Sequence, residues 1–417
     1  MRKAGTGNVG PAALIHQNGG KRKECELVFL ASQNPNLPQF TRMNRFSKIL
    51  RRRKTLLLAL ALIVATVSSC QEIGFYSQAI KGQYQIFAHQ QVIDKLITDP
   101  QTPEKLRAKL QLIQHLRVFA KDELKLPVDG HYRKYVDVHR EYVVWNVQAA
   151  PQFSLQPRTW WYPMVGSLEY RGYFSEKGAK HYGARIAKKG DDVYVDGVEA
   201  YSTLGWFKDP ILNTFIDRGE PELAEVIFHE LGHQRVFARG DTDFNEAFAT
   251  TVGQEGARRW LRASGKTNLI EKYEVALRRN DQFVHLIMST REQLEKVYGD
   301  TLDKDGKVKA APSPPLPPAE LKQAKARVFA DLRSRYQKLK ESWGGYAGYD
   351  EWFGRELNNA QLNTIANYYD FLPAFERVLE MNGNDMEKFY VEVERLSKLS
   401  KDERHQWLRD LASGARK

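Results

Sequence analysis

Cysteine is scarce in this sequence, and its scarcity excludes one class of fold. The 417 residues include only two cysteines, Cys25 and Cys70, which are too few for a disulfide framework. Hydrophobic residues make up 42% of the chain and charged residues 27%, so the chain can bury a core and is neither wholly disordered nor collagen-like. The length leaves room for two or three domains.

Excess basic charge is also scarce outside the N-terminal region. The formal net charge of +12, taken alone, would suggest a nucleic-acid partner. Residues 1–69 hold twelve lysines and arginines but only two acidic residues, whereas residues 70–417 hold 51 basic and 49 acidic residues. The body of the protein is therefore nearly neutral, and we expect no nucleic-acid partner.

The apolar run at residues 55–67 is too short to cross a bilayer. It has thirteen uncharged, mostly apolar residues, whereas a span needs about 20. A basic stretch precedes it and Ser68-Ser69-Cys70 follows it, which predicts a signal peptide over residues 43–69. The small residues before Cys70 resemble the bacterial lipobox, in which this cysteine is lipidated and the chain is cut before it. An ordinary signal peptide with a chance cysteine, or an uncleaved anchor, is the alternative.

This leader predicts a location. A lipidated Cys70 would anchor the protein to a membrane of the bacterial cell envelope, facing the periplasm. Gln71 follows the cysteine where an aspartate would retain a sorted lipoprotein in the inner membrane, so the resemblance favours the outer membrane. Met43 lies directly before the basic region, and we expect translation to start there. Residues 1–42 would then be a gene-model extension.

Apolar side chains spaced three and four residues apart dominate residues 70–417 and predict an α+β, mainly helical fold. Helices are expected at 74–96 and 103–125, and strands at 142–147, 192–195 and 200–204. We divide this single domain into N-terminal helices at 70–130, a sheet region with a small mixed sheet at 131–218, metal-binding helices at 219–265 and a helical C-terminal region at 266–417. The last contains a Pro-rich insert at 302–318, which we interpret as a flexible hairpin.

The motif that carries chemistry is His-Glu-Leu-Gly-His at residues 229–233. On a helix, His229 and His233 lie on one face and can bind one metal ion. Glu230 lies beside the first histidine, where its carboxylate can reach a metal-bound water and take its proton. The motif alone is of low specificity, because chance matches occur in helical proteins.

The surrounding sequence strengthens the metal hypothesis. Apolar residues at helical spacing run into the motif and continue to Phe237, and Gly240 is expected to end that helix. A catalytic zinc needs three protein ligands and an open position, and Glu246 on the next helix is the candidate third ligand. Asp243 and Glu246 also match a capping box, which is the structural alternative. Glu255 is the second choice of ligand.

The chain resembles the gluzincin metallopeptidases, in which two histidines of one helix and a glutamate of the next bind zinc. Its matching stretches are Phe228–Gln234 and, with the Asn-Glu-Ala-Phe-Ala sequence, Gly240–Thr250. The chain more closely resembles a bacterial family called putative aminopeptidases, whose members are often lipoproteins. This resemblance is also carried by Tyr142–Val147, Val165–Gly166, Tyr170–Phe174, Ala200–Phe207 and Asn358–Phe375. The resemblance implies a zincin-like core, one Zn²⁺ per chain and peptide hydrolysis by metal-activated water.

Substrate-binding residues are less well marked. Gluzincins keep an edge strand that pairs with an extended peptide before the zinc helix, and the strand that begins at Tyr201 takes that place here. A donor to the oxyanion would come from a later helix, where Tyr368 and Tyr369 are candidates. Arg171 could bind a carboxylate or cap a loop.

The sequence thus predicts a zinc metallopeptidase, most simply an aminopeptidase acting on peptides at the cell envelope. An endopeptidase or a cell-wall peptide hydrolase is the alternative within the enzyme class. A non-catalytic envelope scaffold lipoprotein is the alternative from another class. Glu230 favours the enzyme, because a structural metal site has no use for a base beside its first ligand.

Overall fold

The computed structural model describes most of the chain from residue 73 onward. The described residues are 73–162, 166–200, 208–303, 307–366 and 371–414. Four of the site residues proposed from the sequence lie outside these ranges, namely Cys70, Tyr201, Tyr368 and Tyr369. The expected leader and residues 201–204 of the strand expected at 200–204 also lie outside them. By its contacts the chain divides between Ser69 and Cys70, and all described residues belong to the second unit. Within the described ranges, no helix has both the length and the apolar character that crossing a membrane requires.

The N-terminal part of this unit is helical but interrupted. Residues 73–88 form a helix, and after it come β1 (Gln91–Val92), α2 (Ile93–Thr98) and α3 (Glu104–Asp122). One continuous helix over 74–96 was therefore a wrong prediction. The helix ends before His89, whose Nδ1 lies 2.7 Å from the Gln85 carbonyl oxygen, and the next residues pair with a strand instead.

Two small sheets and one hairpin follow. β1, β2 (Lys134–Val136) and β8 (Ile211–Leu212) form a mixed sheet, in which β2 pairs antiparallel with β1 and parallel with β8. The second sheet is antiparallel, and its strands lie in the order β6 (Arg171–Tyr173), β3 (Val144–Pro151) and β7 (Asp191–Val198). β4 (Trp160–Tyr162) and β5 (Gly166–Leu168) form the hairpin. The strands expected at 142–147 and 192–195 thus correspond to β3 and β7.

Helix α4 (Glu176–Ala187) covers the antiparallel sheet at a glycine. A Cβ atom on Gly183 would lie 3.1 Å from side-chain carbons of both Val193 and Val195 on β7, which is tighter than ordinary packing. The missing side chain therefore lets the helix approach the sheet closely.

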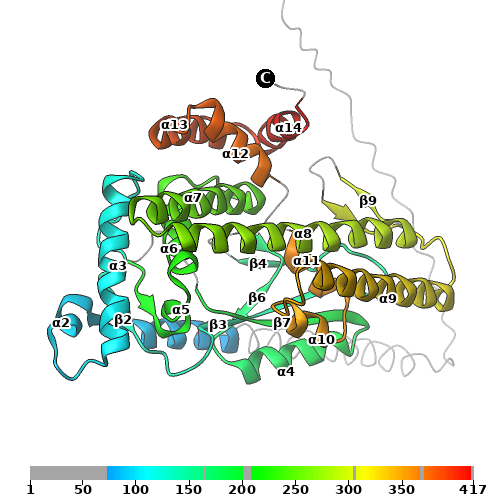
Figure 1. Ribbon diagram of the computed structural model, residues 1–417. Helices are drawn as coiled ribbons and strands as arrows, with labels where there is room; N and C mark the ends of the chain where they lie inside the picture. The colour runs from blue at the N-terminus through cyan, green and yellow to red at the C-terminus, as the bar shows by residue number, and fades with distance from the viewer. Residues whose placement is uncertain (1–72, 163–165, 201–207, 304–306, 367–370, 415–417) are drawn as a thin grey trace, which may run out of the picture. The chain divides into compact units, whose positions relative to one another are not determined.

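The short α5 (Asn213–Ile216) is followed along the chain by two central helices, α6 (Glu220–Arg235) and α7 (Thr242–Ala263). The largest hydrophobic core packs these two helices with α3. Figure 1 shows α6 and α7 in green, side by side. The C-terminal helices complete this core, and they are α12 (Leu372–Met381), α13 (Met386–Ser397) and α14 (Lys401–Ala412). Phe228 and Phe248 are fully buried in it, with Phe375 of α12.

A second core lies among the helices between α7 and α12. Its helices are α8 (Thr267–Tyr298), α9 (Pro318–Ser342), α10 (Asp350–Gly354) and α11 (Asn359–Ala366). Between α8 and α9, within and beside the Pro-rich insert, β9 (Thr301–Leu302) pairs antiparallel with β10 (Val308–Lys309). The prediction of a mainly helical α+β fold with small sheets is confirmed.

Candidate metal site

The helix that carries the His-Glu-Leu-Gly-His motif is shorter than expected. Acidic Glu220 and Glu222 lie in the first turn of α6, where they complement the positive end of the helix dipole. The helix ends at Arg235, and Val236 is already extended with φ −139°. The expected continuation to Phe237 and a stop at Gly240 was therefore wrong. The extended Val236 still places its side chain in the largest core.

The connection between α6 and α7 is fixed by Asn245, the residue before the candidate ligand Glu246. The Asn245 side chain accepts a hydrogen bond from the Ala238 N–H at 2.7 Å and donates one to the Ala238 carbonyl oxygen at 2.8 Å. Both backbone groups of this buried loop residue are thereby satisfied. Sequence reasoning treated Asn245 only as part of a motif and did not assign it this role.

The residue that caps α7 is Asp241, whose side chain accepts a hydrogen bond from the Phe244 N–H at 3.3 Å. Asp243 lies inside the first turn, so the capping box proposed for Asp243 and Glu246 does not form. Glu246 is consequently left to make other contacts.

Two glycines let α6 and α7 lie close enough for their side chains to meet. A Cβ atom on Gly253 would lie 2.8 Å from the Glu225 carbonyl oxygen and 3.1 Å from the His229 Cβ, so the helices would have to move apart. A Cβ on Gly232 would lie 3.3 Å from the Ala249 Cα. This close approach brings the next helix against both histidines.

His229, His233 and Glu246 converge at this contact. Nε2 of His229 lies 3.4 Å from Oε2 of Glu246, and Nε2 of His233 lies 3.7 Å from Oε1. The two imidazole rings are 4.8 Å apart and nearly perpendicular. One ligand atom from each residue lies within 4.8 Å of the others, as a single metal ion requires. Glu255, the second choice of ligand, instead pairs with Arg259 at 2.8 Å.

The electrostatics of the cluster couple the carboxylate to the imidazoles. Burial by itself would raise the pKa of Glu246, but hydrogen bonds and positive charge from His229 and His233 lower that pKa far below its ordinary value. Burial would lower the pKa of His229, yet the hydrogen bond to Glu246 and nearby negative charge raise it overall. Among the residues described, no lysine or arginine forms an ion pair with Glu246, so the histidines are its charge partners.

Glu230 lies beside this cluster with an unused oxygen. Its Oε2 atom is buried and has no hydrogen-bond partner. Burial raises the pKa of Glu230, and positive charge on His229 and His233 only partly opposes that rise. A carboxylate with a buried, unpartnered oxygen beside two histidines is a candidate general base.

A cavity of about 20 Å³ adjoins Glu230 and can hold one water-sized group. Its lining includes Tyr132 and Asp209, both buried, neither of which the sequence reasoning identified. Burial and the negative charges of Glu230 and Asp209 raise the pKa of Tyr132. The Asp209 N–H donates to His131 Nδ1 at 3.3 Å, and the Tyr132 N–H donates to the Asp209 carbonyl oxygen at 2.8 Å. These bonds hold the cavity wall in place.

Other residues of the recognised motifs have structural roles. The Arg171 guanidinium lies 3.9 Å from the centre of the Phe75 ring and is buried, so it stacks within the fold. Asn359 is fully buried and donates from Nδ2 to the carbonyl oxygens of Pro151, Gln152 and Ser154. It therefore ties α11 to the end of β3.

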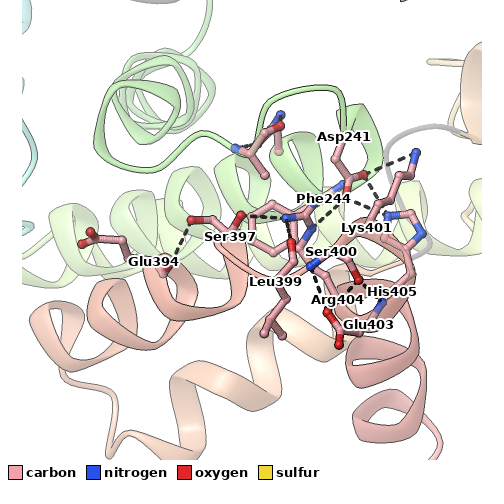
Figure 2. A network of polar contacts seen from close by, with 12 residues as sticks. Asp241, Phe244, Glu394, Ser397, Leu399, Ser400, Lys401, Glu403, Arg404 and His405 are labelled. Carbon is pink, nitrogen blue, oxygen red and sulfur yellow. Dashed lines mark hydrogen bonds and ion pairs between the residues drawn. The ribbon is translucent and has the colours of Figure 1, made fainter. Parts of the chain in front are cut away.

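A second cluster of acids and a histidine involves Asp241, Asp243 and His405. Figure 2 shows Asp241 surrounded by side chains from the last helix, α14. Arg404 Nε donates to Asp241 Oδ2 at 2.8 Å, His405 Nε2 lies 2.8 Å from Oδ1, and Lys401 Nζ lies 3.9 Å away. The Arg404 and Lys401 cations already compensate the charge of the Asp241 carboxylate, so the cluster is a poor fit for a metal ion.

The fold and the site together define a mainly helical α+β protein in which two histidines of one helix and a glutamate of the next form a possible metal-binding group. Comparison with protein families finds that the family described as "Putative aminopeptidase" matches residues 74–408. The chain belongs to this family, which indicates a peptidase and hence peptide substrates. No curated protein and no solved structure matches the chain.

Proposed function

We propose that this protein is a zinc-dependent aminopeptidase of the bacterial cell envelope. The observation that carries the proposal is the convergence of His229, His233 and Glu246 beside the unpartnered carboxylate oxygen of Glu230. The arrangement is that expected of a zincin-like peptidase core, and the family membership supports peptide hydrolysis.

The residues present fit a zinc ion. Two imidazole nitrogens and one carboxylate oxygen are a donor set that zinc prefers at catalytic sites. Glu246 has no competing cation among the residues described, and both of its oxygens face the histidines. When bound, zinc would supply a Lewis acid and lower the pKa of a coordinated water toward about 7.

Glu230 is the proposed general base. Its carboxylate takes a proton from the water that attacks the peptide carbonyl carbon, and it then delivers that proton to the departing amine nitrogen as the C–N bond breaks. A carboxylate suits both steps, since it can first accept a proton and then release it.

The cavity beside Glu230 favours cleavage at a free N-terminus. An α-ammonium group is close to a water molecule in size. The carboxylate of Asp209, which lies in the cavity lining with Oδ2 3.6 Å from His131 Nδ1, would attract its positive charge. Lys208 also lines the cavity, but it is exposed and can keep its charged end in water. We assign Asp209 as the anchor of the substrate amine, which an endopeptidase would not need.

The envelope location rests on the leader. The signal peptide predicted at 43–69 would bring the chain across the inner membrane, and acylation of Cys70 would hold it at a membrane surface.

The central test compares Glu230→Gln with a matched control, Glu222→Gln, which changes an exposed residue of the same helix. Both variants should fold and contain zinc. Turnover of aminoacyl reporter substrates should fall by about 10²–10⁴-fold in Glu230→Gln and remain unchanged in the control. Equal activity of wild type and Glu230→Gln would refute the role of Glu230.

The substrate class is tested with pairs of peptides that differ only in N-terminal acetylation. An aminopeptidase cleaves the free peptide, and Asp209→Asn should raise its KM. Cleavage of internally quenched, acetylated peptides by the wild type would instead indicate an endopeptidase. No hydrolysis of either class by zinc-loaded wild type would favour a non-catalytic scaffold.

A further inference from the structure

The helix formed by residues 73–88 exposes large apolar side chains in a row. Ile73, Tyr76, Ile80 and Tyr84 are 66%, 38%, 70% and 68% exposed. They are three, four and four residues apart, and at about 100° per residue these steps place them on one stripe of the helix. Single exposed apolar residues are ordinary, but a contiguous stripe marks a contact surface.

The opposite face of the same helix is packed, so its orientation is fixed. Phe75 lies 5.4 Å from the Tyr173 ring, and Ile86 belongs to the largest core. A Cβ on Gly82 would lie 2.1 Å from a ring carbon of Phe174, which shows how closely that ring covers the helix. Turning the apolar stripe inward would break all of these contacts.

The composition of the helix indicates what covers the stripe. Lys81 is the only charged residue between 73 and 88, so the helix offers little to an acidic or basic protein partner. Tyrosines beside isoleucines suit the boundary between lipid headgroups and acyl chains. Cys70, the predicted acylation site, lies only three residues before Ile73.

We propose that the stripe of Ile73, Tyr76, Ile80 and Tyr84 lies on the lipid surface to which Cys70 is anchored. This inference rests on the lipid-anchor part of the proposed function. An acyl anchor so close to the helix keeps the stripe at a high effective concentration near the bilayer, so a modest affinity suffices. A second copy of the chain has no such local advantage.

The contact would also orient the catalytic site. Gln83, Ile86 and Phe87 of the same helix line the cavity beside Glu230. A helix is about 10–12 Å across with its side chains, so the cavity would lie about that far from the lipid. The two faces of one helix would thus serve the membrane and the site.

The test uses the unit that begins at residue 70, which contains no cysteine besides Cys70. In a Cys70→Ser background, an N-terminal hexahistidine tag on nickel-chelating lipid replaces the acyl anchor. An environment-sensitive fluorophore is attached at Ile80→Cys or, as the matched control, at Val391→Cys on α13, where Val391 is also 64% exposed. Vesicles contain phosphatidylethanolamine and phosphatidylglycerol, with or without a lipid-borne quencher.

We expect the fluorophore at position 80 to brighten severalfold on vesicles and to be quenched from the acyl chains, while the one at 391 does not change. Adding Ile73→Gln and Tyr84→Gln should reduce that response about tenfold, since it removes much of the apolar area, and salt up to about 1 M should leave it intact.

Equal responses at 80 and 391 would overturn the inference. So would brightening at position 80 that depends on protein concentration without vesicles, because that result would indicate a second copy. Failure of the stripe proposal is distinguishable from failure of the proposed function. Absence of native acylation at Cys70 would refute the lipid anchor, but it would not affect the stripe experiment, because the synthetic tether replaces the acyl chain there.

Discussion

Helix α7 carries two clusters of similar composition within five residues of each other. At its N-terminus, Asp241 meets His405, and one turn later Glu246 meets His229 and His233. Each is a buried or half-buried carboxylate in contact with imidazole, and each forms a possible metal-binding group. Their surroundings differ, because Arg404 and Lys401 also face Asp241.

The difference shows that residue types alone do not define a metal site. Asp241 caps the helix and accepts hydrogen bonds from Arg404 and His405. Its side chain is fully buried, and the cations of Arg404 and Lys401 face it. Within the part of the chain that the structure describes, the ion-pair partners of Glu246 are His229 and His233 alone. A positive metal ion would meet repulsion at the first cluster and would complete the second, because a carboxylate that is already neutralised is a poor ligand.

The largest expected difference comes from removing one histidine from each cluster. His233→Ala should remove zinc and lower turnover about a thousandfold or more, because the several kcal/mol supplied by the metal would be lost. His405→Ala should keep zinc and most activity but unfold at lower denaturant. Metal analysis after dialysis, with activity and urea unfolding of both variants, checks this. Loss of zinc in His405→Ala alone would reverse the assignment of the two clusters.

The next largest effect is expected from breaking the buried ion pair. Arg404→Met leaves Asp241 without its strongest cation and should lower the free energy of unfolding by about 3–5 kcal/mol. Arg409→Met, at a half-buried position on the same helix where Arg409 Nη2 donates to the neutral Gln406 side chain at 3.4 Å, is the control and should change the free energy of unfolding little. Chemical denaturation measures both. A cost below about 1 kcal/mol for Arg404→Met would mean that the pair contributes little to holding α14 on α7.

A smaller effect is expected where the two central helices touch. Gly253→Ala forces α6 and α7 apart and should cost about 1–3 kcal/mol, and it should also weaken zinc binding because Glu246 and His229 move relative to each other. Gly265→Ala, which meets nothing within 4 Å but lies at φ +68°, serves as a control for helix-end strain without helix separation. Unchanged zinc affinity in Gly253→Ala would show that the site tolerates the shift.

The smallest effect is a difference in pH dependence. Burial by itself would raise the pKa of Asp241. The hydrogen bond from His405 and the charges of Lys401 and Arg404 outweigh burial and lower that pKa below its ordinary value. A lowered folded-state pKa stabilises the fold above the unfolded value of about 3.9, and this stability disappears as the pH falls through the folded-state pKa. Wild type should therefore lose more stability than Asp241→Asn between about pH 5 and pH 2, as measured by urea unfolding. Parallel curves would exclude this contribution.

Local spacing was enough to predict which side chains converge at the candidate site. The i, i+4 spacing of His229 and His233 places them on one helix face whatever the rest of the chain does, and Glu246 follows on the next helix. The mainly helical class also followed from apolar periodicity, since a repeat of three and four residues is a local property.

Local spacing failed where distant residues decide the outcome. The sequence favoured Gly240 as the end of the first helix and offered Asp243 as an alternative cap of the next. In the structure the first helix ends at Arg235, the Asn245 side chain binds the loop backbone, and Asp241 is the cap. The break before His89 likewise depends on pairing with β2, which lies more than 40 residues later.

The sequence by itself determined which side chains are candidates to bind a metal and to act as a base, because candidacy follows from residue types and short spacings. Only the tertiary structure decided that Asp241 meets Arg404 and His405, more than 160 residues away, and that Asp209 borders the cavity beside Glu230. The physical reason is that charge compensation and desolvation depend on every group within a few ångströms, and sequence order does not specify those neighbours.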